Sequence, residues 1–264
     1  MPDLRRLASN FGGVGVVLVL LLAVTFLPAD NSLQEVRATG TISACVPATY
    51  PPLVTGDPDK PGIDIELLRA VTARLGVGLS LNINDAIGRD INPRNWALTR
   101  GNCLVIAGGV VDSSLTRSFL ETSPPYAKTG WAMLSPQPVG DLKGLDVGVL
   151  TLVSGLDRIG LANLLRRSET HLQVVRTPEE LVAGIADRSF DVGITEALMA
   201  SHLASDNKWN VAWMPPELLR YNLVFGLWKG DMTLKRAIDQ AFADLAADGT
   251  IAEILARYAG APLN

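Results

Sequence analysis

Residues 101–126 bring together residue types that could bind a small charged molecule. In this stretch the apolar run Leu104–Ala107 is followed by Gly108 and Gly109, and then by Arg117. A strand that ends in two residues without side chains would bring bare backbone N–H and C=O groups to the edge of a sheet, where they can contact a ligand. A lone arginine suits a carboxylate, because its planar guanidinium donates two parallel, charge-assisted hydrogen bonds. The alternative is a buried strand followed by a solvated arginine.

The composition argues against several other kinds of function. With 27 acidic and 23 basic residues, the chain is mildly acidic and has no basic stripe, so we do not expect it to bind nucleic acid. Two histidines and two cysteines cannot form an ordinary zinc site without the help of carboxylates. The sequence also lacks the motifs GxSxG and HExxH and a phosphate-binding glycine loop. We therefore expect no catalytic residue, no metal and no cofactor.

The first 29 residues have the features of an export segment. Arg5 and Arg6 precede the uncharged apolar run Phe11–Leu27, and a polar stretch follows it. Two interpretations of residues 1–29 stay open: a cleaved signal peptide, which we favour, or an N-terminal membrane anchor. Leu27-Pro28-Ala29 is a poor cleavage site, and the apolar run is near the lower limit for spanning a bilayer. Both interpretations predict a protein of the periplasm or of the extracytoplasmic face of the membrane.

After this segment about 235 residues remain, enough for one large or two small domains. Expected strands and helices alternate along them in two similar runs. In the first run, strands are expected at Thr41–Val46, Leu79–Asn84 and Leu104–Ala107, with a helix that has Asp64 as its N-cap and ends at Gly76.

The second run repeats this layout. Strands are expected at Val147–Leu150, Leu172–Val175 and Asp191–Thr195, with helices from Ser154 to about Arg166 and over Pro178–Ala186. Strands that alternate with helices indicate α/β structure with parallel sheets. Two such halves predict a cleft between lobes, where ligands usually bind.

Six parts of the chain resemble, in order and spacing, the periplasmic solute-binding proteins of family 3, which capture polar amino acids for ABC importers. Each motif alone is weak, but their succession is specific. The similar segments are Gly40–Leu53, Gly62–Leu67, Val105–Gly109 with Thr122–Tyr126, Asp141–Val149, Phe190–Thr195 and Lys229–Gly260.

The resemblance implies a two-lobe, type II periplasmic-binding-protein clamshell, in which each lobe is a parallel-type sheet flanked by helices. Lobe one would comprise residues 38–130 plus 227–264, and lobe two residues 135–222. Residues 131–134 and 223–226 would be hinge strands that let the lobes close on a ligand. The implied protein is a monomer that binds a small amino-acid-like or organic-acid ligand without chemistry. Its implied partners are the membrane subunits of an ABC importer.

The family's ligand contacts correspond here to Tyr50, Gly108, Gly109, Arg117, Ser154 and Glu196. The sequence departs from the family pattern at three points, of which Arg117 and Glu196 are the first two. Thr116 occupies the position of the arginine that grips the ligand carboxylate, so Arg117 takes this role only if the loop is one residue shorter. Glu196 replaces an aspartate that pairs with the ligand ammonium, and the alternative is a carboxylate at a helix start.

Two further positions bear on the ligand. Residues 152–155 (LVSG) stand where the family has G-T-T-G, so Ser154 keeps part of an anion-binding helix start while Leu152 and Val153 make the wall more apolar. This difference argues against a standard α-amino acid. Tyr50 either forms an aromatic wall for the ligand or packs on its proline-rich turn.

Other functions of the same fold stay open. Accessory proteins of periplasmic quinoprotein dehydrogenases resemble this family and carry cysteines at the positions of Cys45 and Cys103. A membrane-tethered ligand sensor is a further alternative if residues 1–29 are retained. Cyclohexadienyl dehydratases share the fold, but Met199 stands where they carry an acidic residue, so we do not expect an enzyme.

Export makes a disulfide between Cys45 and Cys103 possible. Cys45 comes late in its strand and Cys103 precedes its own, and a three-residue offset between parallel strands is roughly 10 Å. A bridge needs Cα atoms within about 7 Å, which only a bent approach to the strand at Gly101-Asn102 could provide. This register argues slightly for two buried free thiols.

Overall fold

The computed structural model describes residues 16–19, 29–87, 93–151 and 156–259. The chain divides into two units, Met1–Asn31 and Ser32–Asn264, and the fold described below is that of the second. Most of the expected signal peptide or anchor, residues 1–29, lies outside the described residues. Within the described ranges, no helix combines the length and the apolar character needed to cross a membrane.

The first of two sheets has a parallel centre and an antiparallel margin. Its strand order is β2-β1-β3-β11-β4, and β5 also pairs with β11. Strand β1 is parallel to β2 and β3, whereas β11 is antiparallel to β3, β4 and β5. The strands are β1 (Thr41–Val46), β2 (Gly78–Ile83), β3 (Val105–Val111), β4 (Leu120–Thr122), β5 (Ala127–Thr129) and β11 (Tyr221–Trp228).

The second sheet follows the same plan, with the order β10-β6-β9-β7-β8. Strand β7 is parallel to β8 and β9, and β6 runs antiparallel to β9 and β10. The strands are β6 (Trp131–Ser135), β7 (Asp146–Leu150), β8 (His171–Val175), β9 (Val192–Glu196) and β10 (Asn210–Trp213).

The expected hinge strands are members of these sheets. Residues 131–134 lie in β6 of the second sheet, and residues 223–226 lie in β11 of the first. The chain passes between the sheets at Gly130 and at residues 214–220. Hinge motion and the lobe boundaries remain predictions.

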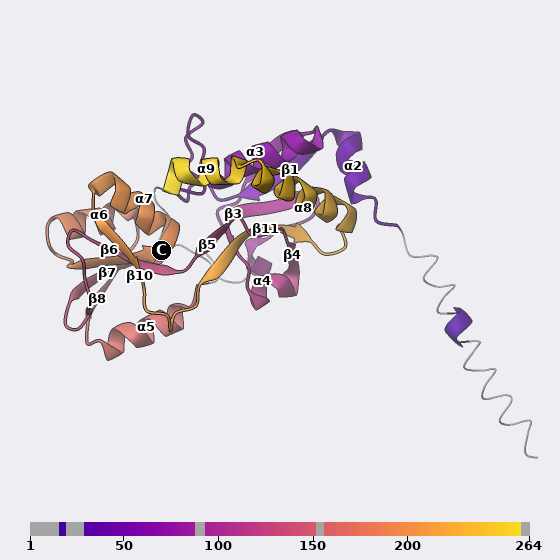
Figure 1. Ribbon diagram of the computed structural model, residues 1–264. Helices are drawn as coiled ribbons and strands as arrows, with labels where there is room; N and C mark the ends of the chain where they lie inside the picture. Colours follow the sequence, from indigo (N-terminus) through magenta and orange to yellow (C-terminus); the bar gives the residue numbers. More distant parts are fainter. Residues whose placement is uncertain (1–15, 20–28, 88–92, 152–155, 260–264) are drawn as a thin grey trace, which may run out of the picture. The chain divides into compact units, whose positions relative to one another are not determined.

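Helices accompany both sheets. Figure 1 shows α3, α8 and α9 side by side on the first sheet, and these helices contact one another in pairs. Helices α6 and α7 pack against strands of the second sheet. The helices are α2 (Ser32–Thr39), α3 (Ile63–Leu75), α4 (Ser114–Phe119), α5 (Arg158–Arg167), α6 (Pro178–Ala186), α7 (Ala197–Asn207), α8 (Met232–Ala247) and α9 (Thr250–Ala259), with a 3₁₀ turn, η1, at Pro93–Trp96.

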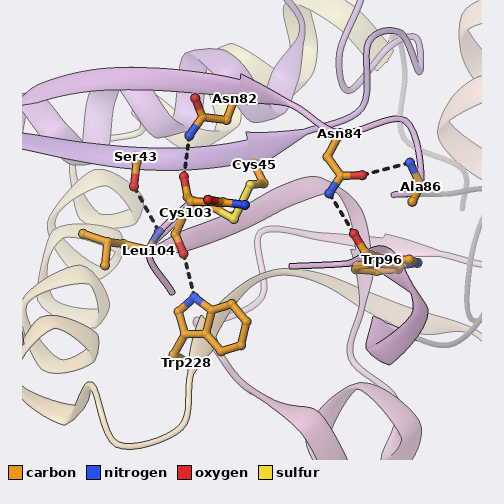
Figure 2. The surroundings of a disulfide bond; sticks show 10 residues. Ser43, Cys45, Asn82, Asn84, Ala86, Trp96, Cys103, Leu104 and Trp228 are labelled. Carbon is orange, nitrogen blue, oxygen red and sulfur yellow. Dashed lines mark hydrogen bonds between the residues drawn. A yellow bond between two sulfur atoms is a disulfide. The ribbon is translucent and has the colours of Figure 1, made fainter. Parts of the chain in front are cut away.

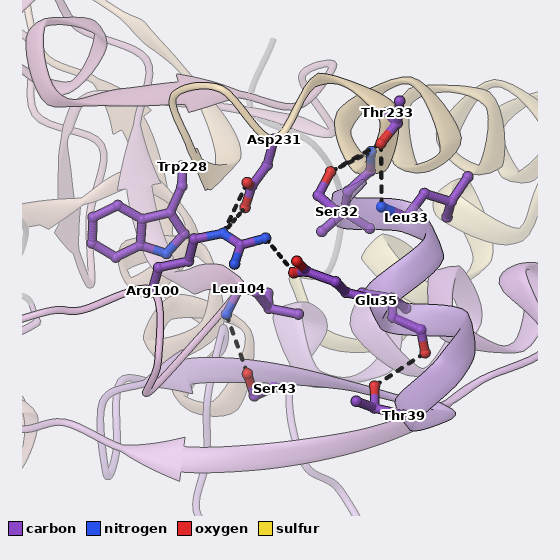
Figure 3. A network of polar contacts seen from close by, with 12 residues as sticks. Ser32, Leu33, Glu35, Thr39, Ser43, Arg100, Leu104, Trp228, Asp231 and Thr233 are labelled. Atoms are coloured by element: carbon purple, nitrogen blue, oxygen red, sulfur yellow. Dashed lines mark hydrogen bonds and ion pairs between the residues drawn. The ribbon is translucent and has the colours of Figure 1, made fainter. Parts of the chain in front are cut away.

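Polar contacts fasten α2 to the start of α8 (Figure 3). The Arg100 guanidinium pairs with Asp231 through Nε at 2.9 Å and with Glu35 through an Nη at 2.8 Å. Ser32 Oγ accepts a hydrogen bond from the N–H of Leu234 and lies 3.0 Å from Thr233 Oγ1. The first helix of this unit is therefore anchored at its side and at its N-terminal end.

Three local expectations differ from the structure. Helix α3 begins after Gly62, and Asp64 lies within its first turn instead of capping it. Strand β3 does not end at Gly108 but continues to Val111, with a bulge against β11. Helix α5 begins at Arg158, capped by the Asp157 side chain, which accepts a hydrogen bond from the N–H of Gly160.

Cys45 and Cys103 form a disulfide, so the expectation of free thiols is wrong (Figure 2). The predicted register is present, because Cys45 pairs with Ile106. However, the chain turns just before β3, where the N–H groups of Asn102 and Cys103 both donate to the Thr99 carbonyl. This turn brings the two cysteine Cα atoms to 5.4 Å, within the range of a bridge.

Candidate functional site

The first part of the site is a fully buried carboxylate, Asp64, in the first turn of α3. Its Oδ2 accepts hydrogen bonds from the N–H groups of Gly108 at 2.6 Å and Gly109 at 3.2 Å. Its Oδ1 accepts one from the Tyr126 hydroxyl at 2.6 Å. Burial raises the pKa of Asp64 to about 6, although the same hydrogen bonds act to lower it.

Backbone conformation and close neighbours leave no room for a side chain at Gly108 or Gly109. Gly108 and Gly109 have φ values of 94° and 86°, which side chains disfavour. A Cβ on Gly108 would lie 2.1 Å from Pro47, and one on Gly109 would lie 2.9 Å from the Tyr50 ring. The expected backbone without side chains is therefore present, but its N–H groups donate to Asp64. The ring of Tyr50 and Pro47 cover this backbone.

The second part of the site is Glu196, which ends β9 in the second sheet and is 1% exposed. One carboxylate oxygen accepts a hydrogen bond from the Met199 N–H at 2.9 Å and so caps α7. The other carboxylate oxygen accepts a hydrogen bond from the hydroxyl of Thr129, at the end of β5. Burial raises the pKa of Glu196, opposed by these hydrogen bonds. The capping role that we gave as the alternative for Glu196 is thus present.

Tyr50 connects the two parts. It follows β1 in the first sheet, is 6% exposed, and its hydroxyl has no hydrogen-bond partner among the described residues. Burial raises the pKa of Tyr50 well above its usual value, and the nearby carboxylates of Glu196 and Asp64 raise it further. Side chains from both sheets therefore meet in one buried polar cluster, which consists of Tyr50, Asp64, Tyr126, Thr129 and Glu196.

This cluster contains two carboxyl groups, those of Asp64 and Glu196, and no lysine or arginine of the described ranges forms an ion pair with either. No group of three or more histidine, cysteine, aspartate or glutamate residues in that part of the chain is arranged to hold a metal ion. The cluster is suited to accepting hydrogen bonds from a positively charged group.

The Arg117 guanidinium lies outside the cluster. It is 65% exposed and pairs with Asp112 through two hydrogen bonds of 2.5 Å. Thr116, at the position of the family's arginine, is buried and donates to the Val111 carbonyl at 2.7 Å. The described geometry therefore does not bring Arg117 together with Glu196.

Comparison with known proteins decides the family. The sequence profile of "Bacterial extracellular solute-binding proteins, family 3" matches residues 42–261, nearly the whole described unit. The chain belongs to this family. The family consists of extracellular proteins, which places this solute-binding protein outside the cytoplasm.

Solved structures support the same fold. The solute-binding protein resembles an ancestral cationic amino acid solute-binding protein, AncCDT-1, with a TM-score of 0.74 and 19% identity over 86% of this chain and 99% of the other. It also resembles an ancestral arginine-binding protein bound to arginine, with a TM-score of 0.64 and 22% identity over 84% and 99%. A third is an ABC uptake transporter substrate-binding protein from Streptococcus pneumoniae with bound histidine, with a TM-score of 0.66 and 20% identity over 88% and 97%. At these identities the likeness concerns the fold, which is the two-lobe type II architecture.

The structure also adds residues to the site of this solute-binding protein. Ser154 lies outside the described residues. Sequence reasoning missed Asp64, Tyr126 and Thr129 as members of the cluster. The signal for Asp64 was a carboxylate in the otherwise apolar start of GIDIEL, which we interpreted as a local cap. Tyr126 stood in the quoted Ser-Pro-Pro-Tyr turn, but nothing in the sequence paired it with Asp64.

Proposed function

We propose that the protein captures a small polar ligand between its two sheets and releases it, without chemistry, to the membrane subunits of an ABC importer. The observation that carries this proposal is the meeting of Tyr50, from the first sheet, with Glu196, from the second, in a buried polar cluster. Amino-acid-like ligands are the first class to test, because the family and the names of similar structures point to them.

The Tyr50 hydroxyl supports a binding role. A buried hydroxyl without a partner costs about 1–3 kcal/mol, so proteins seldom keep one without a use for it. A ligand that supplies an acceptor or donor beside Glu196 would remove this cost. We therefore propose Tyr50 as a ligand contact, and the contacts by Gly108, Gly109, Arg117, Ser154 and Glu196 likewise stay predictions.

Glu196 could couple ligand binding to the relative movement of the two lobes. Its carboxylate binds both the start of α7 and Thr129, the residue before the crossing at Gly130. The Gly130 carbonyl also accepts a hydrogen bond from the N–H of Ala197. A ligand held by Glu196 would thus act on the segment that joins the sheets, which is where closure requires rotation.

Thermal-shift screening followed by calorimetry tests the proposal, with amino acids, amines, organic acids and opines as ligands. A true ligand at a hundredfold excess over Kd stabilises the folded state by about 2.7 kcal/mol. Tyr50→Phe should lower the affinity while leaving the unliganded protein as stable or more stable, because the hydroxyl removed has no partner. Tyr221→Phe, in β11, is the matched control. The proposal fails if no ligand of the screen shifts the melting temperature.

One observation favours a second candidate, an accessory role in a quinoprotein dehydrogenase system. The cysteine pair that suggested it, Cys45 and Cys103, is joined in a disulfide. Under this candidate the protein would co-purify with a quinoprotein and a cytochrome, and their genes would be its neighbours. Neighbouring importer genes, together with ligand binding, would exclude it.

A further inference from the structure

The two segments that cross between the sheets touch each other at Gly130. The pairing of β5 with β11 joins Thr129 to Tyr221, so Gly130 and Arg220 stand next to this pair. A Cβ on Gly130 would lie 3.5 Å from the Arg220 Cα and 3.4 Å from its Cγ. The first crossing therefore packs directly against the end of the second.

The indole of Trp213 lies at the same point and belongs to the second sheet. Trp213 is the last residue of β10 and pairs with Ala132 of β6. Its ring would lie 3.3 Å from a Cβ on Gly130, and the Arg220 guanidinium lies over it, with Cζ 4.3 Å from the ring centroid. This distance is that of a cation–π interaction.

This contact joins the two sheets beside the crossings. Trp213 is held to the second sheet through its pairing with Ala132, whereas Arg220 directly precedes β11 of the first sheet. A rotation of one sheet against the other at the crossings would therefore move the guanidinium relative to the ring. The contact favours the arrangement in which it is made, which is also the arrangement in which Tyr50 meets Glu196.

Trp213 makes this contact on the side of the second sheet that faces away from Glu196. Ala132 pairs with both Trp213 and Thr195, so these three side chains share one face of the sheet. Glu196 follows Thr195 and pairs with Trp131, so it belongs to the opposite face. An effect of Trp213 on affinity would therefore act through the lobes and not through contact with a ligand at Glu196.

We infer that Arg220 and Trp213 are positioning residues, which hold the lobes in the arrangement described here and so set the affinity for the ligand without touching it. The statement on affinity rests on the proposed function. A contact that stabilises the binding-competent arrangement raises its population, and the apparent affinity rises with that population. Because Arg220 is exposed, we expect an effect of about two- to fivefold.

Small-angle X-ray scattering of the unliganded protein tests the lobe arrangement without any ligand. Arg220→Met and Trp213→Leu each remove one partner of the contact, and we expect both to increase the radius of gyration. Arg220→Lys keeps a cation and Trp213→Phe keeps an aromatic ring, so both should stay close to the unchanged protein. Arg236→Met is the matched control, because Arg236 is an exposed arginine of α8, which takes part in neither crossing.

Calorimetry with a ligand from the screen tests the affinity. Arg220→Met should weaken binding about two- to fivefold, and Arg220→Lys should restore most of this loss. Adding Trp213→Leu to Arg220→Met should weaken binding little further, because the contact is already lost. A merely structural role would lower the melting temperature and leave both the radius of gyration and the affinity unchanged.

The outcomes separate this inference from the proposed function. A radius of gyration that is unchanged in Arg220→Met and Trp213→Leu, or a ligand that binds Arg220→Met as tightly as the unchanged protein, would overturn the inference and leave the proposed function standing. If no ligand of the screen binds, the proposed function fails, and scattering alone decides whether the contact holds the lobes. If Trp213→Leu fails to fold, as circular dichroism would reveal, Arg220→Met at its exposed position decides the question.

Discussion

The hydroxyl of Tyr126 donates a 2.6 Å hydrogen bond to Asp64, a residue 62 positions earlier in the sequence. With the N–H groups of Gly108 and Gly109 on its other oxygen, Asp64 has three donors and no exposed surface. This carboxylate therefore joins the start of α3, the bulge of β3 and the turn before β5. It fixes the position of the covered glycines on which Tyr50 packs.

Replacing Asp64 should destabilise the protein strongly. Asp64→Ala leaves three buried donors without an acceptor, and at about 1–3 kcal/mol for each we expect a loss of roughly 3–9 kcal/mol. Tyr126→Phe removes one donor together with its hydrogen bond and should cost about 1–2 kcal/mol. Urea denaturation measures both values. A loss below 1 kcal/mol for Asp64→Ala would show that these bonds contribute little.

The raised pKa of Asp64 predicts a pH dependence with a definite sign. The pKa of Asp64 is about 6 in the folded protein, whereas an ordinary aspartate, as in the unfolded chain, has a pKa of 3.8. The folded state therefore binds this proton more tightly than the unfolded state does. The contribution of Asp64 to stability therefore grows as the pH falls from 6 toward 4, and is lost as it rises through 6. At 1.36 kcal/mol per pKa unit, the full effect is roughly 3 kcal/mol.

The comparison with Asp64→Asn, which cannot titrate, isolates this effect. Urea denaturation at pH 4, 5, 6 and 7 should show the unchanged protein gaining stability relative to the variant toward pH 4. A difference that stays constant, or that grows toward pH 7, would contradict the raised pKa.

Gly109 should tolerate no side chain. A Cβ there would lie 2.9 Å from the Tyr50 ring and 3.2 Å from Leu53, and the φ of 86° adds backbone strain. We expect Gly109→Ala to cost about 2–4 kcal/mol and to weaken ligand binding by displacing Tyr50. Gly140→Ala is the control, because a Cβ on Gly140 meets no atom within 4 Å. Equal stability of the two variants would count against the close packing of Tyr50 on β3.

Elements with strong local signals were predictable from sequence. Helix α6 has the expected bounds, Pro178–Ala186, because Thr177 caps it, proline suits its first position and Leu181 and Ile185 repeat at helical spacing. Helix α7 was missed because it is buried on most sides. Six of its residues are buried, so its sequence shows no clear apolar stripe.

The centre of the site was harder to predict, since its contacts span large sequence separations. Asp64 in the first turn of a helix fits a local capping role equally well, and only the packing of α3 near β3 brings it to Gly108, 44 positions later. Glu196 was singled out from the sequence as a ligand contact, which stays a prediction, but its bond to Thr129 depends on where the chain crosses between the sheets. Arg117 has a carboxylate partner five residues earlier, and no sequence pattern distinguishes that pairing from a ligand contact.

The disulfide gives the last prediction. Cys45 and Cys103 are 58 positions apart, and closing a loop of that length stabilises the folded state by about 4 kcal/mol in the chain-entropy account. Replacing both cysteines with serine should therefore lower the free energy of unfolding by about that amount. The Cys103 carbonyl also accepts the Trp228 indole N–H at 2.6 Å, so Trp228 fluorescence reports whether this corner of β3 stays in place (Figure 2). The intact mass should rise by two hydrogen atoms on reduction, because each sulfur gains one. An unchanged mass would mean that the thiols are free, and the loss of stability would then have to come from packing alone.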